Sequence, residues 1–241
     1  MTIRGPRIHY SLPGLALGVT GRSQRLSSLL DRLVGPFRTA SSSRGDPTQP
    51  AWHIMLETTG PLPENNHRPP GSEPVWSGTD SAGRNVLLRA AETDRRVYEW
   101  PGNGFLELDA SRRTAALATA RDLGDPALTA CLVLLLNELP AATGQYPVHA
   151  APAVLVCGAC GRGKTTAALA ALGAPDGATP WKLIADDACV LSTPDDATTV
   201  RLWGLPRAVN VSEASLDLLR WPRRLPSAPS DRTGARPIPL D

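Results

Sequence analysis

A glycine-rich stretch at residues 154–166, VLVCGACGRGKTT, constrains this chain more than any other part of it. Gly158, Gly163, Lys164 and Thr165 match the spacing G-x-x-x-x-G-K-[ST] of a phosphate-binding loop. Glycines in such a loop let the backbone wrap so that its N–H groups point at phosphate oxygens. The motif therefore predicts a site for a nucleotide phosphate, and a glycine-rich turn that binds nothing is the alternative.

The segments on either side of this loop agree with that prediction. Residues 154–156 are a short apolar run typical of a buried strand, and residues 165–172 are rich in alanine and leucine, which favours a helix. The start of that helix adds unpaired N–H groups and a partial positive charge. Lys164 is expected to reach the β- and γ-phosphates, and the Thr165 hydroxyl is expected to hold Mg²⁺. The expected nucleotide-binding residues are Gly158, Ala159, Cys160, Gly161, Arg162, Gly163, Lys164, Thr165 and Thr166.

The composition is that of an ordinary globular protein. The 241 residues are 41% hydrophobic and 20% charged, and the formal net charge is +2. So small a charge gives no general reason to expect binding to nucleic acid or to a membrane surface. No apolar run approaches membrane-spanning length, and the N-terminal residues lack the apolar core of a signal peptide. We therefore expect a cytoplasmic protein.

Four cysteines, Cys131, Cys157, Cys160 and Cys189, occur in the chain. Cys157 and Cys160 form a C-x-x-C pair, but both lie in the phosphate-loop stretch, and a zinc site would need two further ligands for which the sequence has no second pair. We interpret them as small loop residues. A redox role for Cys160 stays an alternative, because thiols at helix N-termini are reactive.

The region before the loop reads as a β-rich α+β fold. Alternating or apolar runs predict one or two strands at 8–20 and single strands at 52–58, 85–91, 96–100, 104–108 and 114–119. Helices are expected at 24–34, capped by Ser23, and at 127–139. Residues 60–84, rich in proline and glycine, are expected to be a loop. The predicted organisation is a β-rich region at 1–110, a nucleotide-binding domain at 111–225 and a poorly ordered tail at 226–241.

Two carboxylates follow the loop at a short distance. Residues 181–187 read as an apolar strand that ends in Asp186 and Asp187, 23 residues after Lys164. In open α/β sheets, residues at the carboxyl ends of strands face bound ligands. A carboxylate there can hold Mg²⁺ or orient the attacking group. A turn-forming Asp-Asp pair is the alternative.

These residues together resemble the kinase domain of the HPr kinase/phosphorylase family, including its shorter relatives near peptide-modification gene clusters. The shared pattern reads here as His149-Ala150, the apolar run at 154–156, the loop at 158–165, an Ala/Leu-rich helix and Ala185-Asp186-Asp187. The resemblance covers roughly residues 132–211. It implies a phosphate-loop kinase domain of the HPr kinase/phosphoenolpyruvate carboxykinase type, which is an α/β fold, here within a chain that is α+β overall.

The resemblance also implies roles for individual residues. Lys164 and Thr165 would bind ATP and Mg²⁺, Asp187 would act as the base on a substrate serine hydroxyl, and His149 would lie near it. Asp186 is then expected to bind Mg²⁺, directly or through water. The family's loop serine is Cys160 here, and the stretch Arg201-Leu-Trp-Gly204 lacks the Glu of the bifunctional members, which argues against phosphorylase activity. Kinases that this chain resembles are often oligomeric.

Three functions follow from this reading. The first is an ATP-dependent kinase that acts on a serine or another hydroxyl of a protein or peptide. The second is a nucleotide-hydrolysing switch with no phosphoacceptor, for which no water-positioning residue stands out. The third is a nucleotide-binding partner subunit without catalysis, which the short C-terminal region and the missing Glu favour.

Overall fold

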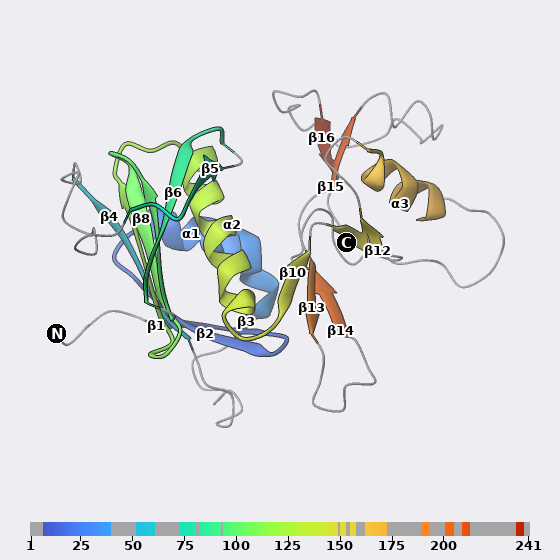
Figure 1. The fold of residues 1–241 in the computed structure, drawn as a ribbon. Coiled ribbons are helices and arrows are strands. Elements are labelled where there is room, and N and C mark those ends of the chain that lie inside the picture. Colours follow the sequence, from blue (N-terminus) through green and yellow to red (C-terminus); the bar gives the residue numbers. More distant parts are fainter. Residues whose placement is uncertain are drawn as a thin grey trace. The chain divides into compact units, whose positions relative to one another are not determined.

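The computed structural model describes residues 7–39, 52–60, 73–80, 82–92, 94–148, 150–152, 155–157, 162–172, 189–192, 201–204, 209–212 and 235–238. The chain divides into two compact units, Met1–Thr143 and Gly144–Asp241. We describe each unit by itself. The described residues form a mixed α/β structure with one large sheet and few helices (Figure 1).

The first unit is built on a nine-stranded sheet in the order β3-β1-β2-β4-β9-β8-β7-β6-β5. Its strands are β1 (Arg7–Leu12), β2 (Leu15–Gly21), β3 (Arg38–Thr39), β4 (Trp52–Thr59), β5 (Trp76–Thr79), β6 (Asn85–Glu92), β7 (Arg95–Trp100), β8 (Gly104–Asp109) and β9 (Thr114–Ala120). β4 pairs in parallel with β2 and with β9, whereas the other pairings are antiparallel. β4 therefore lies inside the sheet, between β2 and β9.

Alternation along these strands gives the sheet one buried face. In β4, Trp52, Ile54 and Leu56 are buried, whereas the intervening His53 is exposed. The buried residues of neighbouring strands fall in register with them: Ile54 lies opposite Val19 of β2 and Ala115 of β9. Burial of these side chains supplies the main driving force for folding of this unit.

Two helices, α1 (Gln24–Val34) and α2 (Asp125–Ala141), contact each other and the central strands (Figure 1). The Ser23 side chain caps α1 by accepting a hydrogen bond from the Leu26 N–H at 3.3 Å, as predicted from the sequence. A 3₁₀ turn, η1 (Gly35–Phe37), follows α1 directly. Arg25 of α1 forms a 2.7 Å ion pair with Asp125 in the first turn of α2. Four residues of α1 form its buried stripe, namely Leu26, Leu29, Leu30 and Val34.

The structure corrects two expectations about this unit. Residues 76–79, expected to be loop, form strand β5, which pairs with β6 after a tight connection in which the Asp80 N–H donates to the Arg84 carbonyl at 2.9 Å. The boundary expected after residue 110 falls instead after Thr143. The physical reason is that β9 is a central strand paired with β4 and β8, and α2 packs against it, so both belong to the large sheet.

The described residues of the second unit form helix α3 (Lys164–Leu172) and three small sheets. The first sheet has the order β10 (Tyr146–Val148), β13 (Cys189–Ser192), β14 (Arg201–Gly204). The second sheet pairs β11 (Ala150–Pro152) with β12 (Leu155–Cys157). The third sheet pairs β15 (Val209–Ser212) with β16 (Ala235–Ile238). The pairings described in this unit are antiparallel. The strand predicted at 181–187 lies outside the described residues and stays a prediction.

The C-terminal region also differs from expectation. Residues 235–238, predicted to belong to a poorly ordered tail, form β16, in which Ile238 lies opposite Val209 and Pro237 opposite Asn210. A proline is compatible with a strand that is paired on one side, because its missing N–H then falls on the outer edge.

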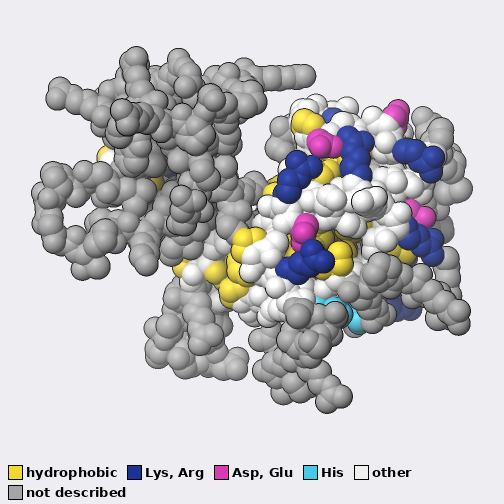
Figure 2. Space-filling model, turned by 180° about the vertical axis from the view of Figure 1, so that it is seen from behind, with side chains coloured by type: hydrophobic (Ala, Val, Ile, Leu, Met, Phe, Trp, Pro, Cys, Tyr) yellow, Lys and Arg dark blue, Asp and Glu magenta, His cyan; other side chains and the backbone are white. Residues whose placement is uncertain are grey.

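The surface of the described residues mixes both signs of charge. On the face shown in Figure 2, Lys and Arg side chains lie among Asp and Glu side chains. Ion pairs such as Arg95–Glu107 at 2.7 Å and Arg22–Glu57 at 3.4 Å account for part of this mixing. Of the helices that the structure describes, none is both long enough and apolar enough to span a bilayer.

Candidate functional site

The phosphate-loop motif lies in the sequence between strand β12 and helix α3, and Arg162 and Gly163 are the loop residues that the structure describes. β12 ends at Cys157 and α3 begins at Lys164, so strand and helix flank the motif as the sequence predicts. Gly163 has a φ of +81°, a backbone conformation that favours glycine, and it leads directly into the helix. At the start of α3, the Ala167 N–H donates a hydrogen bond to the Gly163 carbonyl at 2.9 Å. The second motif glycine thus sets the entry of the chain into α3.

The predicted ligands at the start of α3 differ in their exposure. Lys164 is buried, with 9% of its surface exposed, Thr165 and Thr166 are partly buried, and Arg162 is exposed. Ala168, one turn further on, is buried, and α3 contacts β11, β12 and β15. Helix α3 therefore packs against strands of its own unit, and the residues around its start range from buried to exposed.

The charge at this helix start suits an anion. The first turn of α3, all of it described, contains no Asp or Glu. No carboxylate of that turn therefore reduces the partial positive charge of the helix N-terminus. A phosphate group is the kind of ligand that such an arrangement binds.

The remaining predicted site residues lie outside the described residues. They are His149, Gly158, Ala159, Cys160, Gly161, Asp186 and Asp187. Their roles stay predictions, as does the Mg²⁺ site expected from Thr165 and Asp186. Within the described part of the chain, no group of three or more His, Cys, Asp or Glu side chains is placed to hold a metal ion.

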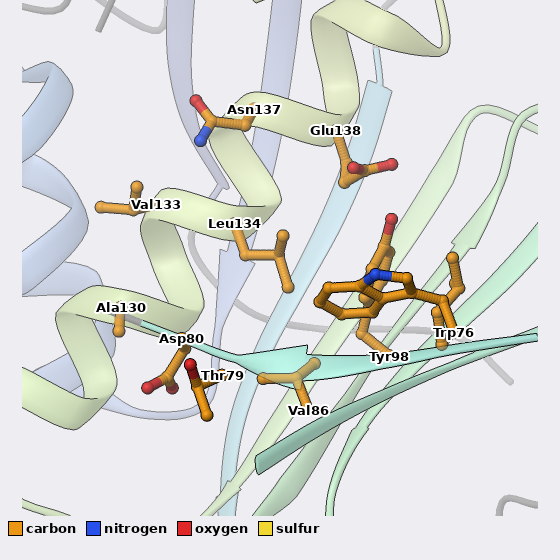
Figure 3. A pocket seen from close by; sticks show the side chains of 11 residues that line it. Trp76, Thr79, Asp80, Val86, Tyr98, Ala130, Val133, Leu134, Asn137 and Glu138 are labelled. Carbon is orange, nitrogen blue, oxygen red and sulfur yellow. The ribbon is translucent and has the colours of Figure 1, made fainter. Parts of the chain in front are cut away.

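A second candidate is a pocket of about 530 Å³ in the first unit, between α2 and the β5–β6–β7 end of the sheet (Figure 3). Trp76 of β5 and Tyr98 of β7 face Leu134 of α2 across it (Figure 3). This volume is in the range of small-ligand sites in proteins. The full lining consists of Trp76, Thr79, Asp80, Val86, Leu88, Tyr98, Ala130, Val133, Leu134, Asn137 and Glu138.

Asp80 anchors one end of this pocket. Its carboxylate accepts from the Arg84 guanidinium at 2.6 Å, from the Trp100 Nε1 at 3.0 Å, and from the backbone N–H of Ala82 at 2.9 Å. Burial acts to raise the pKa of Asp80, but the hydrogen bonds and charge of Arg84 outweigh it and lower that pKa. The Asp80 carboxylate therefore has a structural role, because it accepts hydrogen bonds from three groups of the same unit.

Glu138 and Tyr98 form the polar group at the other end. Glu138 accepts a hydrogen bond from Arg96 at 2.9 Å and lies in hydrogen-bond contact with Tyr98. Burial, and then the adjacent Glu138 charge, raise the pKa of the Tyr98 hydroxyl well above its usual range. This pocket has no counterpart in the sequence predictions, because residues 76–79 were expected to be loop. The β-branched and aromatic residues Val75, Trp76 and Thr79 before Asp80 are the signal that could have indicated a strand there.

The side chains of Cys131 and Cys189 are buried, and neither forms a disulfide bond. The Cys131 Sγ lies 3.2 Å from the Arg84 Nη2, and burial raises the pKa of this thiol despite the nearby cation. A thiol with a raised pKa is protonated at neutral pH and is a poor nucleophile. Cys131 therefore acts as a core residue.

Comparisons of the chain with protein-family models, with curated proteins and with solved structures found no match.

Proposed function

We propose that the second unit binds Mg-ATP at residues 158–166 and that the protein transfers the γ-phosphate to a serine or another hydroxyl of a protein or peptide. The motif order carries the proposal: β12, a glycine loop and α3 follow one another, with Gly163 at a positive φ directly before Lys164. This arrangement supports phosphate binding. The proposed fold of this unit is the phosphate-loop kinase type that the sequence resembles.

Each proposed residue has a defined part in this reaction. Lys164 neutralises charge on the β- and γ-phosphates, and the Thr165 hydroxyl and Asp186 hold Mg²⁺, which neutralises charge on the same phosphates. Asp187 accepts the proton of the substrate hydroxyl as its oxygen bonds to the γ-phosphorus, and the bond from that phosphorus to the ADP oxygen breaks. Positioning and charge neutralisation supply most of the catalysis in such transfers. His149 is proposed to lie beside the accepting hydroxyl.

A nucleotide-binding subunit without catalysis is the second candidate. The stretch Arg201–Gly204, described as strand β14, carries no Glu, and this departure from the bifunctional family members favours it. The same absence argues against phosphorylase activity. Binding of Mg-ATP without transfer of phosphate would distinguish this candidate from a kinase.

One experiment separates these functions and a nucleotide-hydrolysing switch. The full chain is incubated with γ-labelled ATP and Mg²⁺, with and without cell extract, beside the Lys164→Ala variant. A kinase moves label to a protein in the extract, a switch releases labelled phosphate, and an inactive binder does neither. We expect label on protein with the wild type and none with Lys164→Ala. Labelled free phosphate alone, or no turnover by the wild type, would contradict the kinase proposal.

A further inference from the structure

The pocket of the first unit lies beside a free edge of the sheet. β5 is the last strand in the sheet order, and among the described residues no strand pairs with its outer side. The Asp80 N–H bonds to the Arg84 carbonyl at 2.9 Å, toward β6. Because backbone groups alternate in direction along an antiparallel strand, the N–H and C=O groups of Ser77 and Thr79 point to the outer edge.

β5 is short, at four residues, but it lacks two other features that usually protect an exposed strand, a charged side chain and a proline. Charged side chains, prolines and bulges discourage pairing at sheet edges. β5 has the sequence Trp-Ser-Gly-Thr, with no charge and no proline, whereas the strand at the opposite edge of the sheet, β3, carries Arg38. Two exposed apolar side chains, Val75 and Trp76, mark the start of β5, and they are 63% and 51% exposed. Within the part of the chain that the structure describes, the β5 edge is therefore open to an added strand.

Trp76 connects this edge to the pocket. A Cβ atom added at Gly78 would lie 2.3 Å from two carbons of the Trp76 indole, so the ring lies over Gly78 along the strand. Figure 3 shows the indole beside Tyr98 on the wall of the pocket. A side chain from a strand added next to Gly78, on the same face, would therefore meet the indole and the pocket behind it.

The charges around the pocket indicate what that side chain is. Both lining carboxylates are already matched by arginines of the same unit: Asp80 by Arg84 at 2.6 Å and Glu138 by Arg96 at 2.9 Å. A charged ligand group would have to compete with these pairs and lose its hydration. A neutral aliphatic or aromatic side chain fits the apolar lining without that cost.

We propose that β5 and this pocket bind an extended peptide by strand addition, with one neutral apolar side chain of the peptide inserted beside Trp76. Main-chain hydrogen bonds to Ser77 and Thr79 hold the peptide, and the pocket selects the side chain. A second copy of the chain fits less well, because two paired four-residue strands bury far less than the ~1,200–2,000 Å² of a stable interface. This inference does not rest on the proposed function, since it concerns the first unit and needs no nucleotide.

The test uses the full chain and the peptide series Ac-Thr-Thr-X-Thr-Thr-Lys(fluorescein)-NH₂, with each amino acid at X, in fluorescence anisotropy titrations without nucleotide. Peptides with Leu, Ile, Phe or Trp at X should bind about tenfold or more tightly than those with Asp or Lys. The Trp76→Ala variant should lose this preference, and Ser77→Pro should weaken every peptide. Proline is tolerated on a strand edge but removes the outward N–H. Tyr146→Ala, which removes a 64% exposed aromatic side chain from the second unit, is the matched control and should bind as the wild type does.

Three results would overturn the proposal. The first is binding that is undetectable for every X at protein concentrations of about 1 mM, or that is independent of X, of Trp76 and of Ser77. The second is equal affinity for the free N-acetyl amides of the preferred amino acids, which would make the pocket a small-molecule site. The third is a dimer in sedimentation that dissociates on Trp76→Ala, which would assign the edge to a second copy. Circular dichroism of each variant confirms that it is folded.

Discussion

Arg84 and Asp80 form a 2.6 Å ion pair that closes the connection between β5 and β6, and the Arg84 guanidinium lies 5.6 Å from the centroid of the Trp100 ring. The side chain of Arg84 is only 17% exposed, and that of Asp80 only 6%. The Arg84 Nη2 also donates to the Ala127 carbonyl of α2 at 2.8 Å. This one arginine therefore links the edge of the sheet to the helix that covers it.

Removing Asp80 should destabilise the first unit strongly. Asp80→Ala leaves a buried guanidinium without its carboxylate and the Trp100 indole N–H without its acceptor. Loss of one partner of a buried pair costs about 3–5 kcal/mol, so we expect a fall in the free energy of unfolding of that order. Urea unfolding of the full chain followed by circular dichroism measures it. Asp122→Ala, at an exposed turn position, is the matched control and should change stability by less than about 0.5 kcal/mol.

The same carboxylate should make stability depend on acid. The pKa of Asp80 is lowered in the folded state, since hydrogen bonds and charge from Arg84 outweigh the effect of burial. A lowered folded-state pKa contributes stability that is present above the unfolded pKa of about 3.9 and is lost as the pH falls below it. The gap in urea midpoint between wild type and Asp80→Asn should therefore shrink from pH 7 to pH 3. A gap of constant size would show that Asp80 ionisation does not stabilise the fold.

Two glycines of the sheet should respond differently to the same substitution. A Cβ atom at Gly104 would lie 2.5 Å from the backbone oxygen of Ala118, which cannot move without disturbing the β8–β9 pair. We expect Gly104→Ala to cost about 1–3 kcal/mol. At Gly78 the clash is with the half-exposed Trp76 ring, which can swing away, so Gly78→Ala should cost less. Thermal unfolding of the two variants side by side tests this order, and equal losses would contradict it.

The first unit shows which elements a sequence can indicate. Helix α1 was predicted with its correct bounds because its signals are local: Ser23 as the cap, leucines on one face and Gly35-Pro36 at its end. Strand β5 was missed because its four residues follow a proline-rich stretch and depend on pairing with β6. The strand order was not predictable either, since the parallel pairs of β4 join segments far apart in the chain.

The two candidate sites also differ in how far the sequence could predict them, because one is a local motif and the other joins distant segments. The phosphate loop is a contiguous motif, so its position between a strand and a helix followed from the sequence. The pocket beside Trp76 is lined by three separate segments, in β5, in β6–β7 and in α2, and no local pattern brings them together. Its two carboxylates, Asp80 and Glu138, are separated by 58 positions (138 − 80) in the sequence.

The assignment of a base to Asp187 gives a kinetic test. Asp187→Asn keeps the size of the side chain but removes its ability to accept a proton, so kcat for transfer to the identified acceptor should fall by about 10²–10⁴. ATP affinity should be retained, because no phosphate contact is removed. Replacing Asp186 should instead weaken the dependence of the rate on Mg²⁺. If Asp187→Asn transfers phosphate at the wild-type rate, Asp187 is not the base.

Calorimetric titration of ATP into the full chain with Mg²⁺ tests the central claim, nucleotide binding at the start of α3. We expect saturable binding of one ATP per chain. Lys164→Ala removes charge-assisted hydrogen bonds worth about 1.5–3 kcal/mol and should weaken binding at least about tenfold. Arg162→Ala removes a neighbouring but exposed positive charge and should change Kd by less than about threefold, because Arg162 is expected to act through its backbone N–H. The absence of binding heat at millimolar ATP, or equal affinity of the wild type and Lys164→Ala, would contradict a nucleotide site at this loop.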